Sequence, residues 1–330
     1  MQELIARGAT VRALVRPNSK IRVRYPEVAY TEVDLLNANA VRGSAVWNDV
    51  THVFHLAGAT NVPSLADFHG GNVTPLENVL DALCRRQLAP RVVLVSSLAA
   101  AGPAHNAQSS VRESDFARPL EWYGQSKLEA ERLAEKHAHQ VPITIVRLPA
   151  VYGPRDRGFL AAFKQASSNV AFHAIPPRDL FDLVHVHDAV SALLLAVEHP
   201  SSIGRTYFVA SDTSLSWQQL YDQVSQLAGV NPIQLVVPLV LLRLGALIGD
   251  ARARITGRMS LITSQKLAMA NAGFWLCDST RIRQELGWRP AITPQNGIRD
   301  TYLWYVGAGW LRVPHSVAPS VTHSVDSNAE

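Results

Sequence analysis

The sequence has very little cysteine. Cys84 and Cys277 are its two cysteines, and no Cys-x-x-Cys or Cys/His ligand spacing surrounds them. This excludes a disulfide framework and argues against a zinc site, so we expect a reducing, cytoplasmic setting. Residues 1–15 include Glu3, Arg7 and Arg12 and contain no apolar core, so they do not match a signal peptide.

Charge of either sign is also scarce and is not gathered in one place. Only 18% of the residues are charged and 47% are hydrophobic, which predicts a folded core and excludes disorder for most of the chain. The net charge is +4, with small basic groups at 12–24 and 252–258. This distribution favours a mildly basic enzyme over a nucleic-acid-binding protein.

Long hydrophobic runs are absent. The longest, at 235–249, contains Pro238 and Arg243 and is shorter than a membrane span. We interpret it as a buried or lid-like helix that lines a pocket, with contact to a membrane surface as the alternative. The spacing of Gly245 and Gly249 carries little weight in so short a segment.

Apolar strands and helices alternate along the first part of the chain. Helical patterns cover 38–47, 72–87 and 125–138, and strand patterns cover 10–15, 28–33, 52–57, 91–97, 143–148 and 206–210. Strands that are apolar on both faces are typical of a parallel sheet covered on both sides by helices. The predicted fold class is therefore α/β, with a doubly wound parallel sheet.

The alternation loosens near residue 150, where turn signals become frequent. We expect residues 1–150 to form a dinucleotide-binding core and residues 151–312 to form a smaller, mostly helical substrate lobe. A segment at about 183–210 is expected to return to the core. Residues 313–330, rich in Ser, Val and Pro, are expected to be a disordered tail.

Three residues have the pattern of an acid/base site. Tyr123 and Lys127 are four apart on a predicted helix, so they share one face, and a nearby ammonium can favour a phenolate. Ser97 ends a predicted strand, at the edge where open α/β sheets bind ligands. The alternatives are an ordinary surface pair for Tyr123 and Lys127, and a strand-ending cap for the serine.

His185 and His187 form a second pattern, since alternate residues of a strand share a face. No third ligand follows at suitable spacing, so we do not predict a metal site. Asp188 is the expected cap of the next helix.

Eight motifs in a fixed order resemble the extended short-chain dehydrogenase/reductases, a group of NAD(P)-dependent epimerases, dehydratases and dihydroflavonol-type reductases. The resemblance covers residue 1 to about residue 312. The motifs are "DLL" at 34–36, "VFHLAG" at 53–58, "GNV" at 71–73, "VSSLAAAG" at 95–102, "YGQSK" at 123–127, "RLPAVYGPRDRG" at 147–158, "LVHVHDAV" at 183–190 and "ELGWRP" at 285–290. Together they are far more specific than any one of them.

The resemblance implies a role for each member of the predicted site. Ser97 would position the substrate oxygen, Tyr123 would be the acid/base, and Lys127 would hold the ribose and tune the tyrosine. The other residues implied in cofactor binding are Asp34 and Leu35 near adenine, Leu56, Ala57 and Gly58 in a strand-end loop, Asn72 at a helix start and Pro149 beside the nicotinamide. Gly58, Asn72 and Pro149 can also be read as a turn, a helix cap and a loop proline.

Arg16 closes the first predicted strand, where NAD-binding members place an acidic residue for the ribose hydroxyls. An arginine there suits the 2′-phosphate of NADP, and Lys20 is nearby. We expect NADP, with NAD as the alternative.

The family begins with a strand and a glycine-rich turn, and no such glycine spacing occurs in these 330 residues. The opening "QELIARG" matches the end of the helix that follows that turn. We expect a Rossmann-like core that is truncated at its N-terminus, with a slot in the sheet where the first strand belongs. Of two explanations, an upstream start is favoured over a genuine truncation that binds dinucleotide weakly.

The predicted function is an NAD(P)-dependent oxidoreductase or epimerase that acts at a carbinol or ketone carbon of a small molecule. Ala150, where many nucleotide-sugar enzymes carry asparagine, and the apolar segment 233–262 favour an apolar alcohol or ketone over a nucleotide sugar. The alternative is a non-catalytic binding or assembly protein. By resemblance, the helix that carries Tyr123 takes part in a homodimer interface.

Overall fold

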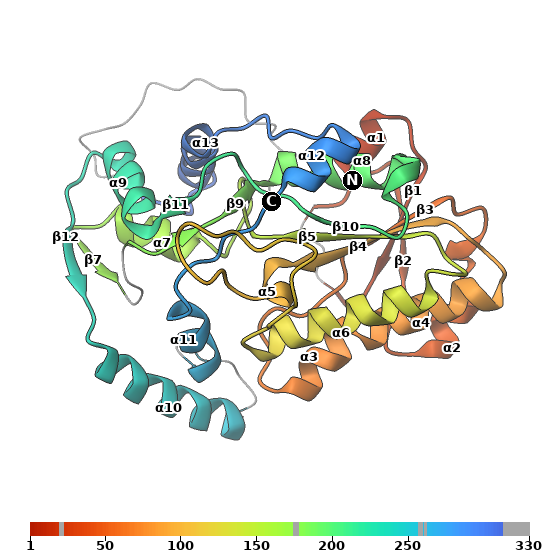
Figure 1. Cartoon of the computed structure of the whole chain (residues 1–330), viewed down its shortest axis with the longest axis horizontal. Helices are drawn as coiled ribbons and strands as arrows, with labels where there is room; N and C mark the ends of the chain where they lie inside the picture. The colour runs from red at the N-terminus through yellow and green to blue at the C-terminus, as the bar shows by residue number, and fades with distance from the viewer. Residues whose placement is uncertain (20–22, 174–177, 257–259, 261–262, 313–330) are drawn as a thin grey trace.

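Four strands form the main sheet of the described chain, and all of them run parallel (Figure 1). The structure is a computed structural model that describes residues 1–19, 23–173, 178–256, 260 and 263–312. In spatial order the strands are β10 (Thr206–Phe208), β5 (Ile143–Leu148), β4 (Arg91–Ser97) and β3 (His52–His55). Every residue of β5 is buried, as a central strand requires.

Helices cover both faces of this sheet. Val92 and Leu94 of β4 pack in one apolar cluster with α4 (Thr74–Arg85) and α6 (Trp122–His137). Val93, between them, packs in another cluster with α8 (Val186–Glu198) and α12 (Thr280–Leu286). Successive strand residues point to opposite faces, so a continuous apolar run serves both helix layers. The predicted doubly wound α/β fold is confirmed.

The chain opens with helix α1 (Gln2–Ala6), followed by strand β1 (Val11–Val15), as predicted. Gly8 ends the helix at φ +74°, where a residue without Cβ is favoured, and its N–H donates to Ile5 O at 2.9 Å. β1 pairs in parallel with β2 (Val28–Glu32).

The β1–β2 pair is a separate sheet. Within the described residues no ladder joins β1 to β3, so the parallel array is interrupted between them. This is the place where the sequence predicts a slot. The inner edges of β1 and β3 there present backbone groups that no described strand pairs.

Several boundaries differ from the predicted ones. The helix expected at 38–47 is α2 (Ala38–Gly43) followed by the short 3₁₀ helix η1 (Ala45–Trp47), because Ser44 caps a new turn by accepting from Val46 N. The helix expected at 72–87 begins at Thr74, where Pro75 fits the first turn. Helix α3 (Leu65–Asn72) was not predicted, although Ser64 and Asp67 have the spacing of a helix start.

The smaller lobe has its own apolar cluster, in which Phe163 and Tyr305 pack edge to face at 5.2 Å. Near 183–210 the chain returns to the main sheet as α8 and β10. The remaining helices are α5 (Leu98–Ala101), α7 (Leu160–Ala166), η2 (Pro200–Ser202), α9 (Trp217–Ala228), α10 (Leu239–Thr256), α11 (Ser264–Ala270) and α13 (Pro294–Gly307). The remaining strands form the pairs β6 (Ala150–Tyr152) with β9 (Leu183–His185), β7 (Val170–His173) with β12 (Ile233–Val236), and β8 (Leu180–Phe181) with β11 (Leu215–Ser216).

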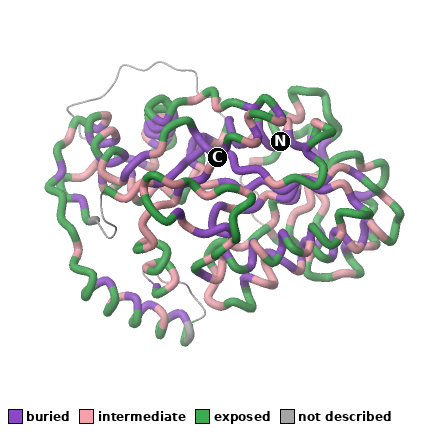
Figure 2. Tube along the Cα trace, in the orientation of Figure 1, coloured by how far each residue is buried: buried purple, intermediate pink, exposed green. Residues whose placement is uncertain are grey.

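Burial follows the main sheet and its helices, whereas α10 stands at the periphery with much of its surface exposed (Figure 2). None of the helices in the described ranges combines the length and apolar character needed to cross a bilayer. Lys20 and the tail at 313–330, which entered the sequence predictions, lie outside the described residues.

Candidate functional site

Helix α6 presents the predicted acid/base pair from its first two turns. Its N-terminus is held by Glu121, whose carboxylate accepts from Tyr123 N at 2.6 Å and Gly124 N at 2.9 Å. Burial raises the pKa of Glu121, and the two N–H groups act against this rise. Tyr123, Lys127 and Glu131 follow at intervals of four, so they lie in a row along one face.

Ser97 ends strand β4 and faces this row. Its hydroxyl accepts from Ala99 N at 3.1 Å and so caps the short helix α5. The same side chain lies near enough to the Tyr123 phenol to lower its pKa. The capping and site interpretations of Ser97 are therefore both compatible with the structure.

Tyr123 is held in a partly apolar place, with its ring 6.1 Å from that of Phe68. Burial raises the pKa of the phenol, the hydrogen bond from Ser97 lowers it, and the charge of Glu121 raises it further. The hydroxyl is therefore protonated at neutral pH and can donate a proton to an oxygen placed against it.

Lys127 is buried with its ammonium inside the site. Its Nζ donates to Val95 O at 2.6 Å. Burial lowers the pKa of this ammonium to about 8, and the charge of Glu131 limits the decrease. The group still carries a positive charge at neutral pH.

Asn72 joins the loop after β3 to helix α6. Its Oδ1 accepts from Ala59 N at 2.8 Å, and its Nδ2 donates to Ala59 O at 3.1 Å and to Ser126 Oγ at 2.8 Å. Gly58 lies so close that an added Cβ would be 2.8 Å from Asn72 Oδ1 and 3.9 Å from Lys127 Nζ. A larger residue at this position would displace the Asn72 amide that holds the loop beside the ammonium.

His55, the last residue of β3, is a member of this site that sequence reasoning did not single out. It is buried, and burial followed by the charge of Lys127 lowers its pKa to about 4. Its Nε2 has no hydrogen-bond partner among the described residues. The motif "VFHLAG" contained this residue, but only the fold brings it next to the lysine.

A buried ion pair lies beneath the same helix face. Arg147 on β5 donates from Nε to Glu131 Oε1 at 2.9 Å and from Nη2 to Glu131 Oε2 at 2.7 Å. Ser96 Oγ also donates to Glu131. Because a buried carboxylate needs such partners, this network ties α6 to two central strands.

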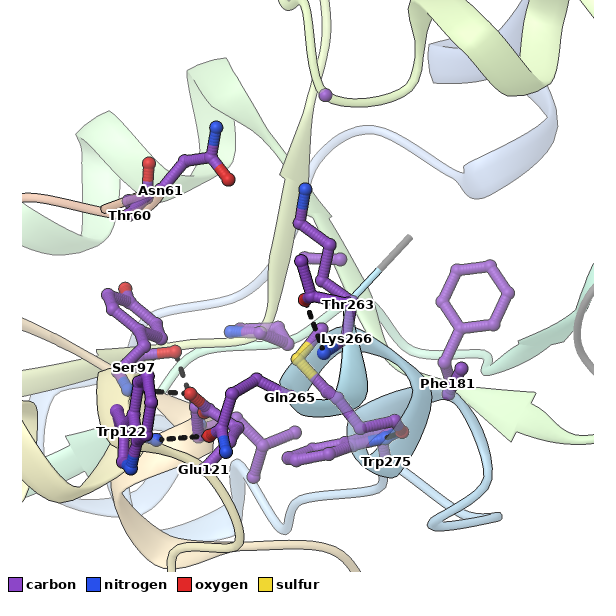
Figure 3. A pocket seen from close by; sticks show the side chains of 18 of the residues that line it. Thr60, Asn61, Ser97, Glu121, Trp122, Phe181, Thr263, Gln265, Lys266 and Trp275 are labelled. Atoms are coloured by element: carbon purple, nitrogen blue, oxygen red, sulfur yellow. Dashed lines mark hydrogen bonds between the residues drawn. The ribbon is translucent and has the colours of Figure 1, made fainter. Parts of the chain in front are cut away.

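A cavity of about 900 Å³ opens beside Ser97 and Tyr123. Figure 3 shows Ser97 and Glu121 on one side of it and Phe181 and Trp275 on the other. The lining is mostly apolar, and helices α10 and α11 contribute one wall. A largely apolar cavity with few polar groups at one end is typical of a small-molecule site.

The other predicted cofactor residues lie at the carboxyl ends of the strands. Pro149 follows β5 and lines the cavity, and Leu56 and Ala57 follow β3. Arg16, Asp34 and Leu35 lie farther along the array, after β1 and β2. Arg16 and Asp34 are exposed, and Leu35 O accepts from Asn78 Nδ2 at 2.8 Å.

The histidine pattern turned out differently from its prediction. β9 ends at His185, which itself caps α8, so His185 and His187 do not share a strand face and Asp188 is not the cap. Asp188 instead accepts from the backbone N–H of Ala291 and Ile292 at 2.9 and 3.0 Å. The carboxylate joins α8 to a distant loop, which local spacing could not indicate.

The geometry of the site agrees with a comparison to known families. A sequence model of the NAD dependent epimerase/dehydratase family matches residues 1–210. The chain belongs to this family. It is therefore an enzyme of the extended short-chain dehydrogenase type, an NAD-dependent oxidoreductase or epimerase.

Relatives within the epimerase/dehydratase family span several activities. A 4-hydroxy-2-methyl-3-oxo-4-farnesyl-3,4-dihydroquinoline-1-oxide ketoreductase of Stigmatella aurantiaca is 26% identical over 330 residues, covering 96% of this chain and 95% of the relative. The ceramide reductase of Caulobacter vibrioides is 26% identical over 261 residues, covering 78% and 74%. The structure of UDP-glucose 4-epimerase from Thermus thermophilus in complex with NAD superposes with a TM-score of 0.73 at 22% identity, covering 93% and 94%.

Proposed function

We propose that this enzyme transfers a hydride between a nicotinamide dinucleotide and a carbinol or ketone carbon of an apolar small molecule. The observation that carries the proposal is that Ser97 and Tyr123 lie together in the lining of a mostly apolar cavity, with Lys127 on the same helix face as the tyrosine. A substrate oxygen placed between these two hydroxyls would meet both a proton donor and an orienting group.

In the direction of reduction, the bound nicotinamide supplies the hydride that the carbonyl carbon accepts. The Tyr123 hydroxyl donates its proton to the carbonyl oxygen, so the product is an alcohol and Tyr123 is left as phenolate. Ser97 holds the oxygen by a hydrogen bond, and the Lys127 charge stabilises the phenolate until it is reprotonated from water. In the direction of oxidation the same steps occur in reverse.

The described residues fit the nicotinamide and ribose end of such a cofactor. Gly58 lets the loop approach the Asn72 amide, Asn72 holds that loop, and the Lys127 ammonium has donors to spare beyond its bond to Val95 O. Pro149 borders the cavity close to where the nicotinamide would lie. This is the support for assigning Asn72, Gly58 and Pro149 to the cofactor.

An apolar substrate is favoured over a nucleotide sugar. Phe159, Phe181 and Trp217 stack along one wall of the cavity, with centroid separations of 4.7 to 6.4 Å. Ala150 also lines it and offers no hydrogen bond to a sugar. The two reductases among the relatives are named for a farnesyl compound and a ceramide, both of which carry long apolar chains.

Replacing the two hydroxyls tests the proposed chemistry. Tyr123→Phe and Ser97→Ala should each lower the turnover of an apolar ketone with NADPH by about 10²- to 10⁴-fold, the usual size of acid/base contributions. Thermal unfolding should change little in Tyr123→Phe, and Ser97→Ala should lose only the stability of one helix cap, about 1 kcal/mol. Tyr30→Phe, on β2, is the matched control and should keep full activity. Unchanged turnover in both site variants would refute the assignment and favour the non-catalytic alternative.

NADP is proposed as the preferred cofactor, supported by Arg16. This side chain is exposed at the end of β1, free to bind a 2′-phosphate. Arg16→Asp should weaken NADPH binding by about 10- to 100-fold, the value of one lost charge-assisted hydrogen bond, and spare NADH. Fluorescence titration with both nucleotides measures this. Equal losses for NADPH and NADH would contradict it.

The remaining proposals follow from the family resemblance and the organisation of the fold. We assign dinucleotide binding to residues 1–150 and the substrate wall to residues 151–312. The proposed homodimer, through the helix that bears Tyr123, can be checked by sedimentation velocity. A cytoplasmic location is supported by Cys84 and Cys277, which are both free thiols.

A further inference from the structure

Helix α10 carries a continuous apolar stripe on its outward side. Six of its large apolar side chains are between 57% and 84% exposed: Val240, Leu241, Leu244, Leu247, Ile248 and Ile255. At 3.6 residues per turn these positions fall on one side of the helix. An exposed apolar surface of this extent is unusual on a protein in water and marks a site of interaction.

The opposite side of the same helix is buried. Leu242, Ala246 and Ala253 are buried, and α10 packs against α11. Figure 1 shows α10 at the lower edge of the molecule, with α11 on its inner side. The helix is therefore apolar on both sides, and only its inner side is covered by the described chain.

Arginine borders the stripe along both edges. Arg243 lies at one edge and Arg252 at the other, and both are exposed. Asp250 follows Arg243 two turns later on the same edge, where it also lines the cavity and its carboxylate accepts from Ser264 N at 3.2 and 3.3 Å. The described charges beside the stripe are thus two exposed arginines and one half-buried carboxylate that is engaged by a backbone N–H.

The strand that leads into α10 extends the apolar surface. Ile233, Leu235 and Val236 of β12 are exposed, as is Phe172 on the paired strand β7. A helix whose exposed side is apolar and bordered by arginines, with further exposed apolar side chains beside it, resembles segments that lie in a membrane interface.

We propose that the apolar stripe of α10 docks on the surface of a lipid bilayer that contains anionic headgroups. The apolar side chains enter the boundary between headgroups and acyl chains, and Arg243 and Arg252 contact lipid phosphates. A second copy of the chain fits less well, because stripe-to-stripe contact would bring the exposed arginines together, and the nearest carboxylate, Asp250, is half-buried and already accepts from Ser264 N. The helix lies on the membrane and does not span it.

Docking in this way would bring the cavity close to the membrane. Leu247, at the edge of the stripe, and Ala253, on the buried side of α10, line the cavity, and so do Lys266 and Met269 of α11. An amphiphilic ketone or alcohol could then pass from the bilayer to Ser97 and Tyr123 without crossing water. This second step rests on the proposed function, whereas the docking does not.

Vesicle co-sedimentation of the full 330-residue chain tests the docking. We expect binding to phosphatidylcholine vesicles that contain phosphatidylglycerol, and weaker binding to phosphatidylcholine alone or at high salt. The double variant Leu244→Glu/Ile248→Glu should reduce partitioning about tenfold or more, since two exposed apolar anchors are lost. Phe116→Glu, an equally exposed apolar residue outside this surface, should bind like the unchanged chain.

Two results would overturn the docking. One is vesicle binding that Leu244→Glu/Ile248→Glu leaves intact. The other is no vesicle binding together with a dimer, seen by sedimentation velocity, that the same variant separates; this would assign the stripe to a second copy.

Measurements of turnover distinguish the proposed passage of substrate from the bilayer to the site, here called delivery, from the reaction itself. The stripe variant should reduce a short water-soluble ketone at the normal rate and a vesicle-embedded long-chain ketone more slowly. Equal rates on the embedded ketone would overturn delivery. If neither ketone is reduced by the unchanged chain while vesicles are bound, the proposed function fails and the docking stands.

Discussion

Two buried basic side chains lie close together in the site, and burial lowers the pKa of each. The ammonium of Lys127 is buried near His55, and its charge adds to burial in keeping the imidazole neutral. Burying these two groups lowers the stability of the fold. Buried groups with shifted pKa values of this kind are typical of functional sites. The effect on stability is easier to measure for His55, because its pKa lies in a pH range where unfolding can be followed.

Acid should unfold this protein in part through His55. Its pKa falls from 6.5 in a free chain to about 4 in the fold, so the unfolded state binds more protons between these pH values. Stability is therefore fully present above pH 6.5 and is lost as the pH falls toward 4. At about 1.4 kcal/mol per pKa unit, this one residue accounts for a loss of about 3 kcal/mol.

The variant His55→Gln does not titrate and should lose less stability than the unchanged chain between pH 7 and pH 4.5, as measured by urea unfolding. His52→Gln, at the exposed start of the same strand, is the control and should behave like the unchanged chain. If His55→Gln lost as much stability in acid as the unchanged chain, other groups would be responsible for that loss.

At the scale of elements, the position of α6 against α5 sets the distance between Tyr123 and Ser97. Gly124 allows this approach: an added Cβ would lie 2.3 Å from the carbonyl oxygen of Ala99, a backbone atom that cannot swing away. The two helices therefore touch through backbone, directly beside the tyrosine. A change at Gly124 acts on geometry without removing any reacting group.

Gly124→Ala should push α6 away from α5 and lower kcat/KM by about 10²-fold, the effect of a displacement near 1 Å. Overpacking should also cost about 1–3 kcal/mol of stability, measured by thermal unfolding. Gly43→Ala is the matched control, since this exposed glycine of α2 has nothing within 4 Å of an added Cβ. Activity kept in Gly124→Ala would mean that the helix contact does not position Tyr123.

At the scale of the whole molecule, we assign different tasks to the parallel strands and the smaller lobe. The carboxyl ends of the strands lie at the proposed cofactor residues, from Arg16 after β1 to Pro149 after β5. The lobe provides most of the cavity and carries the exposed helix α10. Within the described residues, no ladder joins the β1–β2 pair to β3.

Local patterns predicted much of this architecture. Strands apolar on both faces indicated a covered parallel sheet, and the spacing of Tyr123 and Lys127 placed both on one helix face, because periodicity depends only on neighbouring residues. Helix α3 was missed because its apolar pattern is weak, although Ser64 and Asp67 marked its start. The cap expected at Asp188 was wrong because a distant loop competes for that carboxylate.

The amino-acid order alone was enough for the fold class, the family motifs and the hydroxyl, phenol and ammonium of the proposed site, since each depends on short-range spacing. Tertiary packing decided which groups lose water. It buried His55 beside Lys127, paired Glu131 with Arg147, and left the stripe of α10 exposed where the sequence favoured a buried or lid-like helix. Burial depends on what lies opposite a side chain, and that partner comes from distant parts of the chain.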